Sequence, residues 1–233
     1  MTTSDDHPKN GSNGSNGSNG SVLAGLEPPA AAPPHLQPPH LQPSVPPAIE
    51  ELAEACVRFV ERAIGVRLDY TLETLPLLDH YIEAARETLR EKKAGEEGPT
   101  LSIVAQAAGA YFGEVVRRRH LAWWRLDAEP EEHRLEFHHV YLVVRPVMLM
   151  LDALTLESGD KPSGALSGFE LDEDDRAAAA ARLAELPPVP LEEYVSPSTR
   201  LEVLDIVVDA VRAYHMAEGV PVQELEPDDY LDG

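Results

Sequence analysis

The apolar residues of this chain change their spacing partway along the sequence, and this change limits the fold classes that it can adopt. In residues 47–64, 74–93 and about 100–119 they recur every three or four positions, the period of an amphipathic helix. In residues 121–127 and 133–144 they alternate or run continuously, and β-branched and aromatic residues dominate, which is typical of strands. The sequence AEPEE separates these two runs as a turn, so we expect three helices followed by an antiparallel pair of strands.

Helical patterns return after Pro146. The run VMLMLDALTL is long enough for a buried helix, because proline is tolerated in a first turn. An alanine-rich helix is expected from Asp172 to Leu186, with acids at its start that interact favourably with the helix dipole. After an irregular connector, Ser198 is expected to cap a last amphipathic helix that ends near Ala217. The sequence therefore predicts an α+β fold that is mostly helical, with a small antiparallel sheet after three helices and further helices toward the C-terminus.

Composition divides the chain into three parts. Residues 1–47 contain the repeats GSNGSNGSNGS and PPHLQPPHLQP, which cannot bury enough apolar surface to fold, so we expect a disordered N-terminal tail. Its proline-rich unit suits a spacer, or else a docking motif for an aromatic groove. Residues 48–217 are expected to form a single globular domain. Residues 218–233 carry six acids and no base, so we expect a frayed acidic C-terminal tail.

The charge of the chain limits its partners. Lysine and arginine number 19 against 41 acidic residues, which gives a net charge of −22. Phosphates would be repelled, so we expect no binding to nucleic acid or to anionic membranes, and a cationic protein partner is favoured. The sequence contains no signal-peptide pattern and no long apolar run, so a cytoplasmic protein is expected. The single cysteine, Cys56, lies in an apolar helical stripe and is expected in the core.

The histidines and nucleophilic residues of the sequence show no pattern typical of a catalytic or metal site. His138 and His139 are adjacent on an expected strand, so they point to opposite faces, and His133 lies about 20 Å from His139 along an extended chain. No serine-nucleophile motif and no phosphate-binding loop is present. We therefore assign no catalytic, metal-binding or cofactor-binding residue, and expect no cofactor and no enzymatic activity.

The stretch GAYFGEVVRRRHLAWW, residues 109–124, carries the candidate binding residues. Gly109 and Gly113 share one helix face, which predicts a closely packed neighbour rather than a ligand. Trp123 and Trp124 should face opposite sides of a strand, so one enters the core and the other is covered by a helix or stays exposed. An exposed tryptophan beside arginine is typical of a binding hot spot. The candidate partner-binding residues are Arg117, Arg118, Arg119, Trp123, Trp124, Asp228 and Asp229.

Two motifs occur together in the first half of the chain. The sequence LDYTLETLPLLDHYI, residues 68–82, is followed by GAYFGEV and then by a tryptophan at the start of the strand pair. This order resembles that of a loose group of small bacterial α+β domains of unknown function, over about residues 66–155. The resemblance implies two or three helices before a short sheet and a further helix, and it implies no activity or catalytic residues.

These observations favour a non-enzymatic cytoplasmic protein-binding module, such as an inhibitor, an immunity-type protein or an adaptor, that acts on a cationic partner protein. One alternative is an enzyme whose site is built from His138, Glu136, Glu114 and Arg117, which requires these four side chains to converge in one pocket. Another is a structural subunit of a homo-oligomer such as a homodimer, with the spare tryptophan buried at the interface.

Overall fold

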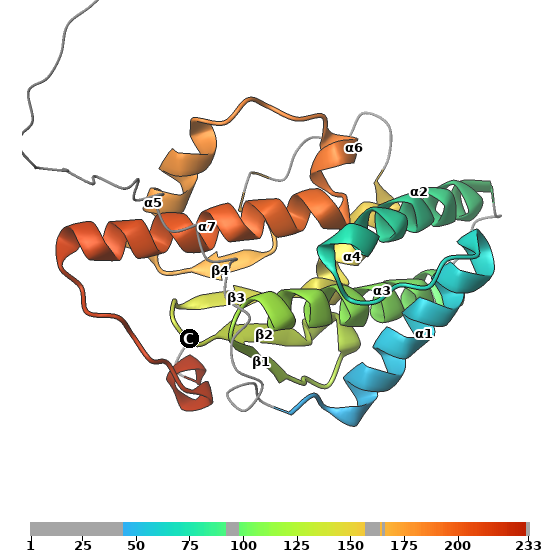
Figure 1. Cartoon of the computed structure of the whole chain (residues 1–233), viewed down its shortest axis with the longest axis horizontal. Coiled ribbons are helices and arrows are strands. Elements are labelled where there is room, and N and C mark those ends of the chain that lie inside the picture. Colours follow the sequence, from blue (N-terminus) through green and yellow to red (C-terminus); the bar gives the residue numbers. More distant parts are fainter. Residues whose placement is uncertain (1–43, 92–97, 157–163, 165, 232–233) are drawn as a thin grey trace, which may run out of the picture. The chain divides into compact units, whose positions relative to one another are not determined.

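The computed structural model describes residues 44–91, 98–156, 164 and 166–231 (Figure 1). Residues 1–43, which make up most of the expected N-terminal tail, lie outside the described residues. Within the described ranges the fold is α+β, mostly helical with a small antiparallel sheet, as the sequence predicts.

Three helices come first, as expected: α1 (Pro47–Ile64), α2 (Leu75–Glu91) and α3 (Gly98–Arg119). α1 ends at Gly65, whose backbone is left-handed with a φ of 83° and whose N–H donates to the Glu61 carbonyl. Cys56 is buried in the core, as its place in the apolar stripe predicts, and burial raises the pKa of its thiol.

The sheet has more strands than expected. Its order is β1 (Ala122–Arg125), β2 (Arg134–Phe137), β3 (Leu142–Val144) and β4 (Phe169–Leu171), and every neighbouring pair is antiparallel. The single strand expected over 133–144 is wrong, because the chain folds back between β2 and β3. No strand was expected at β4, which is only three residues long and pairs with β3, twenty-five or more positions earlier in the chain.

The two faces of the sheet have different surroundings. The row Trp124, Leu135, Val144 and Phe169 points into the main hydrophobic core, beneath the helices. The neighbouring row points the opposite way and forms what we call the outer face: Trp123, Glu136, Val143 and Glu170. The expectation that the two tryptophans face opposite sides is therefore confirmed.

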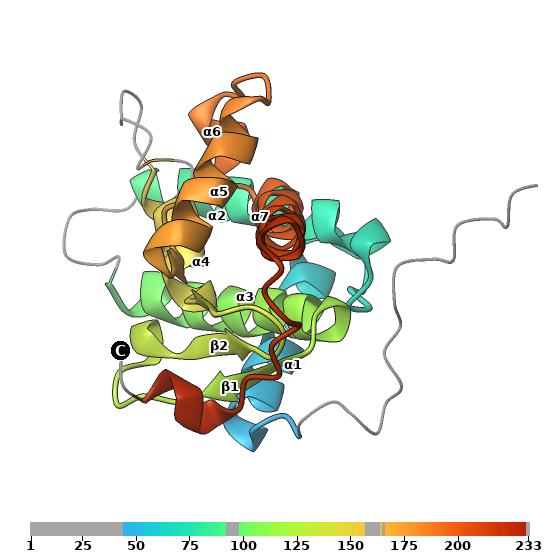
Figure 2. The same cartoon turned by 90° about the vertical axis from the view of Figure 1, so that its left-hand side faces the viewer.

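α3 packs against both α1 and α4 (Pro146–Thr155), and Figure 2 shows it crossing above β1 and β2. A Cβ added at Gly109 would lie 2.6 Å from the Cα of Val147 in α4. One added at Gly113 would lie 2.2 Å from the ring of Trp124. The expected close-packing glycine face is therefore confirmed, with a helix and the sheet as its neighbours.

The second half of the chain contains α4, α5 (Glu173–Ala184), α6 (Leu191–Tyr194) and α7 (Pro197–Glu218). The short helix α6 lies in the connector that was expected to be irregular. The cap of α7 is Ser196, whose Oγ accepts a hydrogen bond from the Thr199 N–H, so the assignment of Ser198 as the cap is wrong. Pro197 explains the difference, since proline favours the first helical position and places the cap one residue before it.

Residues 220–231, which we call the C-terminal segment, pack against the sheet. Figure 1 shows the segment running from the end of α7 to the short 3-10 helix η4 (Pro227–Tyr230), beside β1 and β2. The Leu225 N–H donates to the His138 carbonyl at 2.8 Å, and Arg125 donates to the Pro227 carbonyl. Glu226 and Asp229 form a capping box at η4. The expectation of a frayed tail is therefore wrong for these residues, and residues 232 and 233 lie outside the described part.

Candidate functional site

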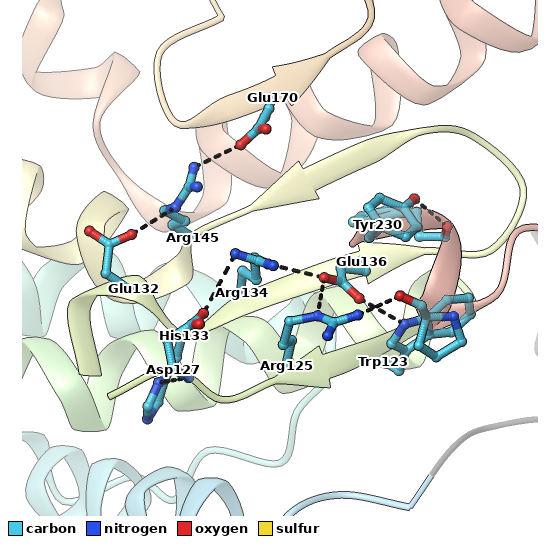
Figure 3. Close-up of polar contacts among 12 residues, drawn as sticks. Trp123, Arg125, Asp127, Glu132, His133, Arg134, Glu136, Arg145, Glu170 and Tyr230 are labelled. Carbon is cyan, nitrogen blue, oxygen red and sulfur yellow. Dashed lines mark hydrogen bonds and ion pairs between the residues drawn. The ribbon is translucent and has the colours of Figure 1, made fainter. Parts of the chain in front are cut away.

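A fully buried carboxylate, that of Glu136, occupies the centre of the outer face (Figure 3). It accepts hydrogen bonds from the indole Nε1 of Trp123 at 3.1 Å, from Arg125 Nε at 2.5 Å and from Arg134 Nε at 3.0 Å. Two guanidinium groups thus balance one buried negative charge, which burial alone would make costly. The arrangement fixes the indole of Trp123 and both arginines in place.

The other cations of the outer face are also paired. Arg145 lies 3.3 Å from a carboxylate oxygen of Glu132 and 3.1 Å from one of Glu170, and Figure 3 shows it between the two. Arg134 makes a second ion pair, with Asp127 at 3.6 Å. The arginines on this face therefore form ion pairs within the protein, and these pairs leave the face with little unbalanced positive charge.

Tyr230 anchors the C-terminal segment to the outer face. Its ring stacks on Tyr141, with centroids 4.8 Å apart, and meets Trp123 edge-on at 6.4 Å. Its hydroxyl donates to the Phe137 carbonyl at 2.6 Å and accepts from the Leu142 N–H at 3.3 Å. Burial raises the pKa of this hydroxyl, so it stays protonated and able to donate.

Two adjacent histidines hold the same segment from the turn between β2 and β3. Nδ1 of His138 lies 2.7 Å from the Leu225 carbonyl, and Nδ1 of His139 lies 3.3 Å from the Gln223 carbonyl. A carbonyl only accepts, so both nitrogens are donors in these contacts. Burial lowers the pKa of His139, which favours its neutral form.

A groove of about 1030 Å³ lies between β1 and the C-terminal segment. Leu121, Leu126, Trp123 and Trp124 contribute apolar surface to it. Three exposed acids on the C-terminal segment also line it: Glu224, Glu226 and Asp228. Arg125, Glu136 and both histidines complete the polar part of the lining. The groove thus joins an aromatic and aliphatic surface to a cluster of carboxylates, of which only Glu136 is balanced by arginine.

The three consecutive candidate arginines are held by separate contacts. Arg117 is buried and forms an ion pair with Glu114 at 2.9 Å. Arg118 is exposed and lies over the ring of Tyr70, 3.9 Å from its centroid. Arg119 pairs with Asp205, which also contacts His120. The three side chains therefore engage three different partners. It is Arg125 that contacts the C-terminal segment.

Both tryptophans are buried, each with about 9% of its surface exposed. Trp124 faces the core and donates its indole N–H to Glu114 at 2.8 Å. Trp123 is covered by the C-terminal segment, so an exposed tryptophan hot spot is not present. The same observation removes the spare apolar ring on which the homo-oligomer alternative rested. Asp228 and Asp229 remain exposed, and Asp229 also accepts the Glu226 N–H.

The four side chains of the alternative enzyme site do not meet. Glu114 contacts both Arg117 and Trp124 on the helix side of the sheet. Glu136 lies on the outer face with Trp123, and His138 contacts the C-terminal segment. The sheet itself separates the two pairs, so these four residues form no common pocket.

Among the described residues, no group of three or more histidine, cysteine or acidic side chains is arranged to hold a metal ion. His133 instead accepts the Asp127 N–H at 3.2 Å. None of the helices in the described part is both long enough and apolar enough to cross a membrane.

Comparisons with protein-family models, with curated proteins and with solved structures found no match to this chain. The resemblance to small bacterial domains therefore stays an expectation that rests on its two motifs. Sequence reasoning also missed Tyr230 as an anchor. An aromatic residue inside an acidic tail, in PDDYLD, is the signal that could have identified it, since a solvated tail has no need of a large apolar ring.

Proposed function

We propose that this chain is a cytoplasmic, non-enzymatic protein-binding module, of the inhibitor, immunity-type or adaptor kind, and that it binds a cationic partner protein. The proposed binding site is the groove between β1 and the C-terminal segment. The observation that carries this proposal is the composition of the groove, which is lined by Glu224, Glu226 and Asp228 and by Leu121, Leu126 and the two tryptophans.

A lysine or arginine side chain suits such a groove for two reasons. Its aliphatic stem can lie on apolar and aromatic surface while its charged end meets carboxylates. A cation over an indole face gains a further attraction from the ring quadrupole. An acidic ligand would meet the same carboxylates and be repelled.

The charge distribution of the whole chain supports the same partner. Several of its arginines are paired with its own acids, as at Glu114, Glu136 and Asp205, and many other carboxylates are exposed. A surface with this excess of negative charge accelerates association with a basic partner, and the acceleration falls as salt rises.

The two tryptophans provide a direct test, because they are the only ones in the sequence and both line the groove. We expect oligolysine and oligoarginine peptides to change the intrinsic tryptophan fluorescence saturably, and the affinity to fall with increasing salt. Oligoglutamate peptides of equal length should produce no change.

Matched charge variants then locate the site. Glu224→Gln with Asp228→Asn should weaken binding of the basic peptides by about tenfold, since two carboxylates beside the ligand are lost. The control is Glu50→Gln with Glu51→Gln, which removes the same charge from exposed positions on α1. If both double variants weaken binding equally, the attraction is a property of net charge alone and the groove is not the site.

A further inference from the structure

A second pocket, of about 380 Å³, is lined by residues of α2, of α6 and of the start of α7. It is separate from the groove and shares no residue with it. Its volume is at the lower end of the range found for small-molecule sites, which suits a ligand of few atoms. Ionisable side chains make up much of its lining, and one of them is a buried cation.

That buried cation is Arg86, of which only 8% is exposed. Its Nε is shielded from solvent and has no hydrogen-bond partner, and no ion pair of Arg86 is found among the described residues. Arg117, also buried, pairs with Glu114. The buried Arg200 has an Nε without a hydrogen-bond partner as well, but its other two guanidinium nitrogens donate to Tyr194 and to the Ser167 carbonyl. A buried guanidinium without an anion is strongly unfavourable, so Arg86 is suited to an anionic group that enters the pocket.

α7 adds to this preference. It is a long helix whose N-terminus, at Ser196 and Pro197, lines the pocket, so its dipole favours negative charge there. Its first amides are already used, since the Ser198 N–H donates to Asp79 and the Thr199 N–H donates to Ser196. The helix therefore contributes the electrostatic field of its dipole, and Arg86 provides the hydrogen-bond donors for an anion.

Carboxylates around the same pocket argue against a simple anion. Glu83, Glu192 and Glu193 are exposed at its edge, and Asp79 is half-buried beside them. A phosphate or a plain carboxylate would gain one cation and face these four acids. A ligand that carries both charges satisfies both sets of groups.

We propose that this pocket binds a free α-amino acid, with its carboxylate paired with Arg86 and its ammonium group among Glu83, Glu192 and Glu193. The planar guanidinium suits a carboxylate because it can donate two parallel hydrogen bonds. In this position the ammonium group is attracted electrostatically by the three exposed carboxylates. The site is independent of the groove and of any protein partner.

A binding screen on the full chain tests the proposal. L-α-amino acids are titrated one at a time by isothermal calorimetry, each beside the carboxylic acid that lacks the amine and the amine that lacks the carboxylate. We expect saturable one-to-one binding of at least one amino acid, and none of its two matched analogues. Absence of binding by the whole set, or equal binding of the acid without the amine, would overturn the proposal.

Variants of Arg86 establish the position of the site. Arg86→Met should weaken binding of the amino acid by at least about tenfold, because a charge-assisted bidentate contact is lost. Arg86→Lys keeps the charge and should bind with intermediate affinity. The control Arg58→Met, at an exposed position on α1, should bind like the parent chain. Unchanged affinity in Arg86→Met would place the ligand elsewhere and refute the assignment.

The melting temperature of Arg86→Met separates loss of binding from loss of folding. Removing a buried cation that has no partner should leave the ligand-free protein as stable as the parent or more so. If Arg86→Met unfolds, the lysine variant carries the test, and a lysine variant that binds as tightly as the parent counts against the bidentate contact.

Discussion

At the scale of single residues, two buried glutamates hold two adjacent tryptophans on opposite sides of the sheet. Trp123 donates its indole N–H to Glu136, and Trp124 donates to Glu114. Each glutamate is also paired with arginine, Glu136 with Arg125 and Glu114 with Arg117. A strongly acidic chain thus uses acids inside the fold as well as on its surface, and these acids fix the aromatic side chains beside the groove.

Two arginine–glutamate ion pairs join residues three positions apart. The pair of Glu114 and Arg117 in α3 is buried, whereas the pair of Arg182 in α5 and Glu185, just after that helix, is exposed. We expect Glu114→Gln to lower the free energy of unfolding by about 3 kcal/mol, because it leaves the buried charge of Arg117 without its carboxylate. Glu185→Gln breaks the exposed pair with Arg182 and should cost no more than about 0.5 kcal/mol. Urea denaturation of both variants measures the difference, and similar losses would contradict the role given to burial.

Gly113 tests the close contact between α3 and β1. Helix propensity alone predicts that Gly113→Ala stabilises the protein by about 1 kcal/mol. We expect a net loss of about 2 kcal/mol instead, because the new Cβ would overlap the ring of Trp124, which its bond to Glu114 holds in place. Chemical denaturation measures the change. Ala84→Gly, at an exposed position of α2, gives the size of the propensity effect in this protein, and a stabilising Gly113→Ala would refute the contact.

At the scale of elements, the start of α7 joins several parts of the fold. Ser196 caps the helix, Ser198 donates its N–H to Asp79 of α2, and Arg200 reaches the Ser167 carbonyl before β4. Burial raises the pKa of Asp79, although the hydrogen bond from Ser198 opposes the shift. This one turn therefore positions α2 and β4 against α7 and forms one side of the proposed amino-acid pocket.

Two serines two residues apart at this turn should respond differently to substitution. Ser196→Ala removes the cap and is expected to cost about 1 kcal/mol of stability. Ser198→Ala should be neutral or slightly stabilising, since the Ser198 Oγ is buried without a hydrogen-bond partner. Thermal and urea denaturation of both variants test this order. A larger loss in Ser198→Ala would restore the original assignment of Ser198 as the cap.

At the scale of the whole molecule, the C-terminal segment packs on the outer face of the sheet. Its acids line the groove, while Tyr230 and Leu225 form a small apolar cluster with Trp123, Val143 and Tyr141. His139, in the turn between β2 and β3, links this docking to pH. The groove therefore depends on a contact between residues about ninety positions apart.

We expect docking of the C-terminal segment to weaken as the pH falls below 6.5, the ordinary pKa of histidine. Burial lowers the pKa of docked His139, so the undocked state binds more protons between the lowered pKa and 6.5. The contribution of His139 to the stability of the docked state is complete above that pH range and is lost as the pH decreases through it. Hydrogen exchange of residues 220–231 measures the docking.

The control for this pH dependence is His139→Gln, which cannot gain a proton in the range and should flatten the response. His138, Arg212 and Glu224 also act on His139 and are unchanged in that variant. Exchange rates that follow the same pH profile in both proteins would show that another group is responsible.

The sequence by itself determined the features that depend on neighbours in the chain. The spacing of apolar residues predicted the three helices α1, α2 and α3. Local sequence also predicted the glycine that ends α1 and the small-residue face at Gly109 and Gly113. The alternation of side chains along a strand likewise predicted that the two tryptophans of β1 face opposite sides of the sheet. The fold class was predictable for this reason.

Only the tertiary structure decided which distant groups meet. Four features depend on partners far along the chain. They are the break in residues 133–144, the three-residue strand β4, the docking of Tyr230, and the pairing of Arg119 with Asp205, 86 positions away. Local pattern carries no information about such partners, because a buried glutamate and an exposed one look the same in sequence. The candidate arginines and tryptophans are engaged in contacts within the fold, whereas Arg86 is a buried cation without an ion pair among the described residues.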